Sequence, residues 1–127
     1  MLYTVKSNVD LKTIKDEIPE KAKDNGLGIL NEYPFKDILK AKGHPIEQDI
    51  TVYELCNPVT AEEVLSKYPE VSVYLPCRVS VYEKDGQVIL STVEMDEITK
   101  NFDIDDMVKN HMNEVFHNLK KMLNSWN

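Results

Sequence analysis

The sequence predicts one mixed domain in which β-strands alternate with helices and a long C-terminal helix packs across a sheet. Three observations support this. Short β-prone segments recur between turn residues, Asp85-Gly86 separates two of them as a hairpin turn, and residues 103–126 carry a helical apolar stripe. With 127 residues and no repeat or linker, the chain fits a single domain at residues 1–127 that can bury a core.

Composition narrows the classes of function. Apolar residues make up 42% and charged residues 29%, as in ordinary soluble proteins. The 15 basic against 22 acidic residues give a net charge of −7, which repels phosphate backbones, so we expect no nucleic-acid partner. No apolar run approaches the roughly 18 residues of a membrane span, so we expect no membrane partner. Without a signal peptide, the two cysteines indicate free thiols in the cytoplasm.

The first elements follow from local patterns. Residues 2–6 predict a strand, and Ser7-Asn8 offers a helix cap. Pro19 predicts a kink or restart within the helix, and Asn25-Gly26 its end. The buried stripe of this helix is expected at Leu11, Ile14, Ile18 and Ala22.

Three further elements complete the first half. Residues 26–33 predict a second strand; their glycines do not form a phosphate loop, because a third glycine and a lysine are missing. A short helix from Pro34-Phe35 to Lys42-Gly43 and a third strand at residues 50–55 follow.

The central segment joins two short motifs. Asn57 and Pro58 suit the cap and first position of a helix that ends at Tyr68-Pro69, with Ala61, Val64 and Leu65 on its buried face. Residues 71–75 predict a strand that bends or reaches a sheet edge at Pro76.

The hairpin and the last helix form the C-terminal half. Residues 78–83 and 87–93 are the predicted hairpin strands, and strand alternation places Cys77 on the apolar face with Val79 and Val81. The apolar stripe of the last helix most commonly packs into the core, and docking onto a partner is the alternative. That stripe comprises Val108, Met112, Val115, Phe116, Leu119, Met122, Leu123 and Trp126.

Cys56 and Cys77 are the main candidates for chemistry. Cys56 precedes a predicted helix N-terminus, a position that lowers the pKa of a thiol. The two cysteines are 21 positions apart, too far for a CxxC motif, but the fold could unite them as a soft-metal site or a reversible disulfide. The alternative, which we favour, is that both are small buried apolar residues.

The remaining polar candidates are isolated. Arg78 alternates to the face opposite Cys77; it either pairs with a carboxylate or binds a small anion together with the helix start at Asn57-Pro58. His44, His111 and His117 do not share one face, and we expect each of them on the solvated surface. No catalytic constellation, metal site or cofactor is predicted.

The two motifs resemble a known family. Cys56-Asn57-Pro58, a helix of about ten residues, and Leu75-Pro76-Cys77 leading into a Val-x-Val-Tyr-Glu hairpin are similar to the domain-of-unknown-function 302 family, over nearly the whole chain. Glu54-Leu55 departs from the small residue common before the first motif. The resemblance implies an α+β domain with helices on one face of a mostly antiparallel sheet, a fold like the TATA-binding protein, and a homodimer. It implies no established activity.

We therefore predict a cytoplasmic, dimeric domain that binds a small molecule, an anion or a protein without catalysis. The predicted ligand-binding residues are Cys56, Asn57, Pro58, Cys77 and Arg78. The alternatives are a redox or soft-metal site at the two cysteines, and a purely structural assembly module that uses the sheet edge and the last helix.

Overall fold

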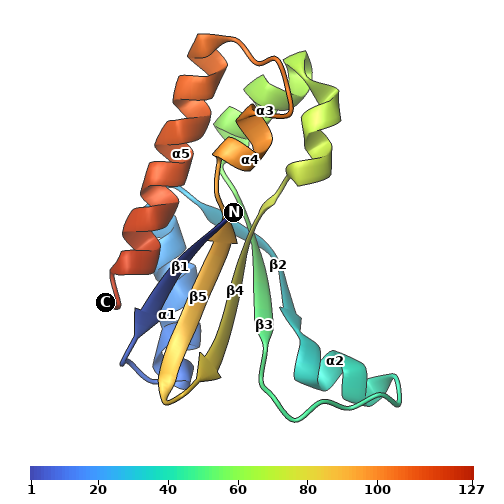
Figure 1. The fold of residues 1–127 in the computed structure, drawn as a ribbon, viewed down its shortest axis with the longest axis vertical. Coiled ribbons are helices and arrows are strands. Elements are labelled where there is room, and N and C mark those ends of the chain that lie inside the picture. The colour runs from blue at the N-terminus through green and yellow to red at the C-terminus, as the bar shows by residue number, and fades with distance from the viewer.

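The computed structural model describes residues 1–127 as an α+β fold around one five-stranded antiparallel sheet (Figure 1). The strands lie in the order β1-β5-β4-β3-β2. Their bounds are β1 Leu2–Ser7, β2 Gly28–Pro34, β3 Thr51–Cys56, β4 Cys77–Lys84 and β5 Gln87–Val93. The helices are α1 Leu11–Asp24, α2 Phe35–Ala41, α3 Pro58–Lys67, the 3₁₀ helix η1 Pro69–Tyr74, α4 Asp96–Thr99 and α5 Asp106–Asn124.

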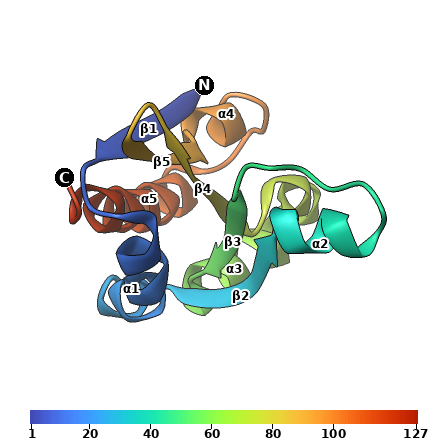
Figure 2. The same ribbon diagram turned by 90° about the horizontal axis from the view of Figure 1, so that it is seen from below.

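The helices cover one face of the sheet and one of its ends. Figures 1 and 2 show α1 and α5 on the same side of the sheet, while its other face carries no helix across it. Helix α3, η1, α4 and the start of α5 gather at the end where β3 finishes and β4 begins, and α2 projects at the opposite end. The predicted placement of helices on one face is confirmed.

The hairpin is formed as predicted. Asp85 (φ 54°) and Gly86 (φ 80°) are both left-handed, the conformation that a type I′ turn needs. The turn sets the register of β4 and β5, in which Val81 lies opposite Leu90. This register places two fully buried side chains together on the helix-covered face.

Helix α1 begins later than expected. Its N-cap is Asp10, whose carboxylate accepts from the Thr13 N–H at 2.7 Å. Ser7 belongs to β1 instead; its hydroxyl donates to the Trp126 carbonyl at 2.6 Å and accepts from the Val9 N–H at 3.1 Å, ahead of the helix. The helix is continuous through Pro19, without the expected restart, and ends at Asn25 as predicted.

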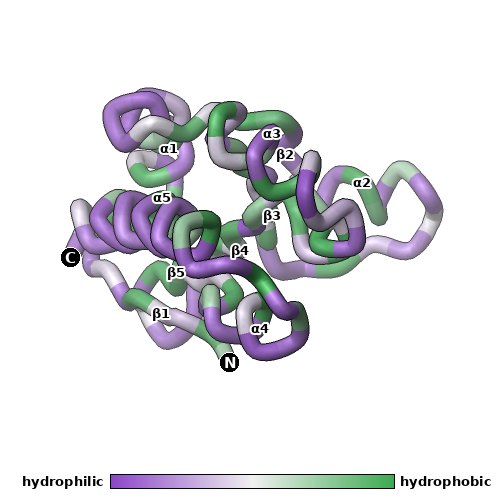
Figure 3. The backbone as a smooth tube through the Cα atoms, turned by 90° about the horizontal axis from the view of Figure 1, so that it is seen from above, coloured by the Kyte–Doolittle hydropathy of each residue, from purple (hydrophilic) through white to green (hydrophobic).

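The helical stripes form the core with the inner strand residues. Ile14, Ile18 and Ala22 of α1 are buried, and so is the α5 stripe apart from half-buried Val115. Figure 3 shows hydrophobic positions along the inner strands and hydrophilic ones along much of α5. Leu65 of α3 is 36% exposed, so its predicted place on the buried face is wrong, whereas Val64 is buried and Ala61 is half-buried.

Residues 71–75 do not form the predicted strand. They lie largely in η1, which begins at Pro69 and is followed by Leu75 and a cis peptide bond to Pro76. A proline at each side removes backbone donors that a strand would need, and the run has no partner strand. The short helix α4 was not predicted. None of the helices is both long and apolar enough to cross a membrane.

Candidate functional site

A small, mostly apolar cavity lies at the covered end of the sheet, between the β3–β4 pair, α3 and α5. Its volume is about 50 Å³, and no charged side chain lines it. The residues that line it are Leu55, Cys56, Asn57, Thr60, Ala61, Val64, Leu75, Pro76, Cys77, Met95, Met112 and Val115. The cavity therefore combines both sequence motifs with a helix more than 50 positions away from the first.

Strand pairing brings the two motifs together. Leu55 lies opposite Cys77 in the β3–β4 ladder, so the end of one strand meets the start of the other. Cys56 is the last residue of β3 and lines the cavity where the chain turns into α3. The two cysteines, 21 positions apart in the sequence, thus share one cavity as free thiols.

Asn57 holds the first motif in place. Its side-chain oxygen accepts from the Thr60 N–H at 3.1 Å, which caps α3, and its amide nitrogen donates to the Gly26 carbonyl at 3.3 Å. Gly26 adopts φ +75°, which glycine favours, so the turn before β2 can present that carbonyl. Pro58 occupies the first helical turn, as predicted, and does not line the cavity.

Both thiols are less acidic than an isolated cysteine. Burial raises the pKa of Cys56, and burial followed by the nearby Cys56 raises the pKa of Cys77 to about 11. The expectation of a lowered pKa at Cys56 is therefore wrong. Desolvation of the sulfur outweighs the effect expected from the helix N-terminus. At neutral pH both groups are thiols.

Two methionines join the site without having been predicted there. Met112 was assigned to the core stripe of α5, and Met95 lies in the segment before α4, which carried no sequence signal. Both are buried, with exposures of 3% and 7%. Like the cysteines, both methionines contain sulfur. Their grouping with the cysteines depends on how α4 and α5 pack against the end of the sheet.

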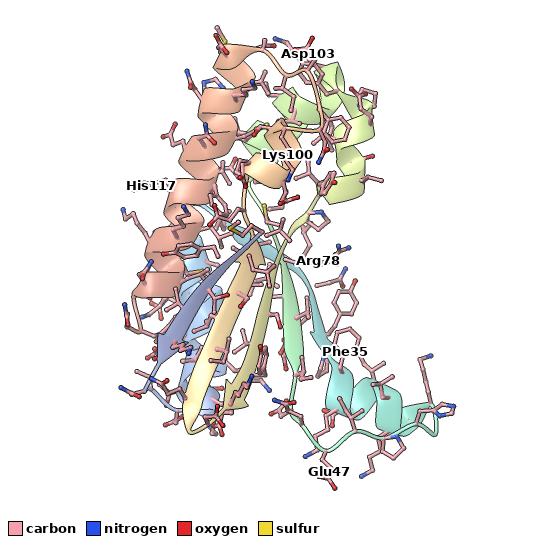
Figure 4. The ribbon with its side chains drawn as sticks, viewed as in Figure 1. Phe35, Glu47, Arg78, Lys100, Asp103 and His117 are labelled. Atoms are coloured by element: carbon pink, nitrogen blue, oxygen red, sulfur yellow. The ribbon has the colours of Figure 1, made fainter.

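A polar groove adjoins the cavity. It has a volume of about 290 Å³ and shares Asn57, Thr60 and Val115 with the cavity wall. His111 lines the groove, with its Nδ1 2.7 Å from Glu63 Oε1. His44 and His117 are exposed, as predicted, and Figure 4 shows His117 on the outer side of α5.

Arg78 belongs to the open face of the sheet. Its Nε donates to Glu54 Oε2 at 3.2 Å, and the Tyr33 hydroxyl donates to Glu54 Oε1 at 2.7 Å. These contacts, the Tyr33 hydrogen bond first, lower the pKa of the buried Glu54. Figure 4 shows Arg78 directed away from α5. It borders a second hollow beside Cys77 but not the cavity, so it does not join Asn57-Pro58 as an anion site.

Known proteins resemble the chain in sequence and in fold. An uncharacterized protein of Aquifex aeolicus (strain VF5) is 33% identical over 54 residues, which cover 42% of this chain and 38% of that protein's length. The crystal structure of an uncharacterized conserved DUF302 protein from Bacillus stearothermophilus is similar at a TM-score of 0.87. That match covers 99% of this chain and 98% of the other at 23% identity, so it shows a common fold.

The family assignment rests on nearly the whole chain. The family described as "Domain of unknown function DUF302" matches residues 3–126, which include both motifs, every strand but the first residue of β1, and all of α5. The chain therefore belongs to the DUF302 family.

Proposed function

We propose that the protein is a non-catalytic binding domain that holds a compact ligand in the cavity between β3, β4, α3 and α5. The observation that carries this proposal is the cavity itself: an uncharged, mostly apolar space whose wall contains residues of both sequence motifs. Asn57 and Thr60 are the polar residues of this wall, and the Asn57 amide already bonds to the Thr60 N–H and the Gly26 carbonyl, so apolar contact dominates the lining.

The size of the cavity limits the ligand. A volume of about 50 Å³ compares with roughly 30 Å³ per water molecule in the liquid and with about 300–1,000 Å³ for sites that enclose drug-sized molecules. The cavity therefore suits an ion, a very small molecule or the apolar end of a longer one. In the last case the polar part would lie in the adjoining groove beside Glu63 and His111.

The surroundings of the thiols support binding over catalysis. A nucleophilic or redox cysteine reacts as its thiolate, whereas a pKa of about 11 leaves roughly one Cys77 in ten thousand ionised at pH 7. The His111 imidazole lines the groove and not the cavity wall, where a general base for a thiol would be needed.

Xenon tests the cavity directly, because it enters dry apolar cavities without needing polar contacts. We expect xenon pressure to shift the amide signals of Thr60, Ala61 and Val115 in ¹H–¹⁵N spectra. Ala61→Leu should fill the space and remove the shifts, whereas Glu62→Leu, at the next and exposed position of α3, should keep them. Absent shifts in the wild type, or equal shifts in the folded Ala61→Leu protein, would contradict the proposal.

We also infer that the protein associates as a homodimer through the open face of the sheet. The support is the family resemblance together with Leu2 and Val93, exposed apolar residues that are cross-strand partners on this face. Light scattering should give twice the chain mass, and Val93→Lys should reduce it to one chain. A single chain mass for the wild type at every concentration would contradict the inference. The cytoplasmic location and the lack of a nucleic-acid partner remain predictions from composition.

A further inference from the structure

Four sulfur atoms belong to residues that surround the cavity. Both cysteines of the chain and two of its five methionines line it. They come from four separate places: Cys56 ends β3, Cys77 begins β4, Met95 precedes α4 and Met112 lies in α5. Because four elements that are distant in the sequence each supply a sulfur residue to one small space, helical or strand periodicity alone does not account for the cluster.

The rest of the wall excludes the ligands that harder metals prefer. It contains no carboxylate, no imidazole and no cationic side chain, and its other polar groups are the Asn57 amide and the Thr60 hydroxyl. Zinc sites use cysteine, histidine and carboxylate ligands, and calcium and magnesium sites use oxygen ligands. Soft thiolate and thioether ligands suit copper(I), zinc and iron–sulfur clusters. With two cysteines and no histidine, the wall lacks the four ligands that structural zinc and iron–sulfur sites use, which leaves copper(I).

We propose that this four-sulfur cavity binds one copper(I) ion per chain, with Cys56 and Cys77 as thiolate ligands and Met95 and Met112 as thioether ligands. The inference rests on the proposed function, because the ion would be the compact ligand of that same cavity. A single ion matches a volume of about 50 Å³, which excludes a drug-sized ligand.

Copper(I) binding displaces the protons of both cysteines, because a cysteine ligates a metal as its thiolate. Two protons are released to the solvent, and the copper–dithiolate unit carries one negative charge. The copper stays copper(I) and no electron is transferred. The thioethers of Met95 and Met112 then bind as neutral donors.

The first test titrates the reduced full chain with copper(I) under anaerobic conditions, in competition with the coloured chelator bicinchoninate. We expect one equivalent per chain and sulfur-to-copper absorption in the ultraviolet. Cys56→Ala and Cys77→Ala should each weaken binding by more than about 100-fold, beyond the 10–100-fold that the loss of an outer partner of a ligand costs. No competition with the chelator, or unchanged affinity in both variants, would overturn the proposal.

The methionines allow a matched comparison within one helix. Met112→Leu removes a thioether from the cavity, whereas Met122→Leu makes the same change at a buried position of α5 away from it. We expect Met112→Leu and Met95→Leu to weaken copper(I) binding by about tenfold or more, the scale of coordination effects, and Met122→Leu to leave it unchanged. Equal affinities in all three variants would overturn the four-sulfur site.

Two further readouts separate this inference from the proposed function. Zinc(II) should bind far more weakly than copper(I); equal or tighter zinc binding would overturn the assignment of the donor set. If xenon shifts the amide signals but copper(I) does not bind, the proposed binding cavity stands and the copper(I) proposal is wrong. Copper(I) binding in the wild type that blocks the xenon shifts would support both.

Discussion

On the helix-covered face of the sheet, Leu55 and Cys77 lie opposite each other at the wall of an uncharged cavity. On the open face, their chain neighbours Glu54 and Arg78 also lie opposite each other, but they form an ion pair that Tyr33 completes. The two pairs are one residue apart on the same two strands. Strand alternation alone separates an apolar, sulfur-rich site from a polar network.

The pKa values follow this division. On the covered face burial dominates, and it raises the pKa of Cys77 to about 11. On the open face hydrogen bonds from Tyr33 and Arg78 dominate, and they lower the pKa of Glu54 despite its burial. Proximity in the sequence is therefore a poor guide to shared chemistry. Arg78 adjoins Cys77 in the chain, but its side chain pairs with the carboxylate of Glu54 on the opposite face.

The largest expected difference between the faces concerns packing. Leu90→Ala removes a fully buried side chain from the covered face of β5 and should lower the free energy of unfolding by about 3 kcal/mol, within the 2–5 kcal/mol typical of such changes. Leu2→Ala is the same change at a residue on the open face that is 62% exposed in the single chain, so its effect should be small at protein concentrations where the chain is a monomer. Urea denaturation measures both. A comparable loss in Leu2→Ala would show that the open face is covered in solution, as a homodimer requires.

A smaller effect should come from the thiol of the covered face. The folded protein keeps the Cys77 proton up to a pKa of about 11, while an unfolded chain releases it near the ordinary value of 9.0. Between these values the folded state binds more protons, so this contribution to stability is complete below pH 9 and is lost as the pH rises toward 11. The full loss corresponds to about 3 kcal/mol, from a shift of about 2 pKa units at 1.36 kcal/mol per unit.

Urea denaturation at pH 8 and pH 11 measures that loss, and Cys77→Ala isolates it. The variant should lose less stability over this range, while the buried Tyr53, whose raised pKa has the same sign, titrates in both proteins. Parallel stability curves for the wild type and Cys77→Ala would show that the Cys77 thiol ionises as freely in the fold as in the unfolded chain.

Local patterns were enough to predict most of the fold. Asp85-Gly86 determines the hairpin, Asn57 and Pro58 determine the start of α3, and the apolar stripe determines α5, because each depends on neighbours within a few positions. The wrong predictions concern positions whose structure depends on residues far away in the sequence. Ser7 is the last residue of β1 and its hydroxyl bonds to the distant Trp126, and Asp10 caps α1 instead.

The candidate site was predictable only in part. The motifs identified Cys56, Asn57 and Cys77, all of which line the cavity, because the resemblance and the turn chemistry both mark them. Met95 and Met112 could not be placed beside them, since their positions depend on how α4 and α5 pack on the sheet end. The sign of the Cys56 pKa shift was also out of reach, because it depends on burial by residues far along the chain.

The smallest expected effect is that of Arg78→Ala. Arg78 is 60% exposed at its side chain and lies outside the cavity wall, so its removal should leave copper(I) affinity unchanged and change stability only slightly. The pKa of Glu54 should rise modestly, because the Tyr33 hydrogen bond, the larger cause of its lowering, remains. Chelator competition and the carboxyl ¹³C shift of Glu54 against pH provide the two measurements. If Arg78→Ala weakened copper(I) binding as much as Cys77→Ala does, the two faces would act as one site and the division between them would fail.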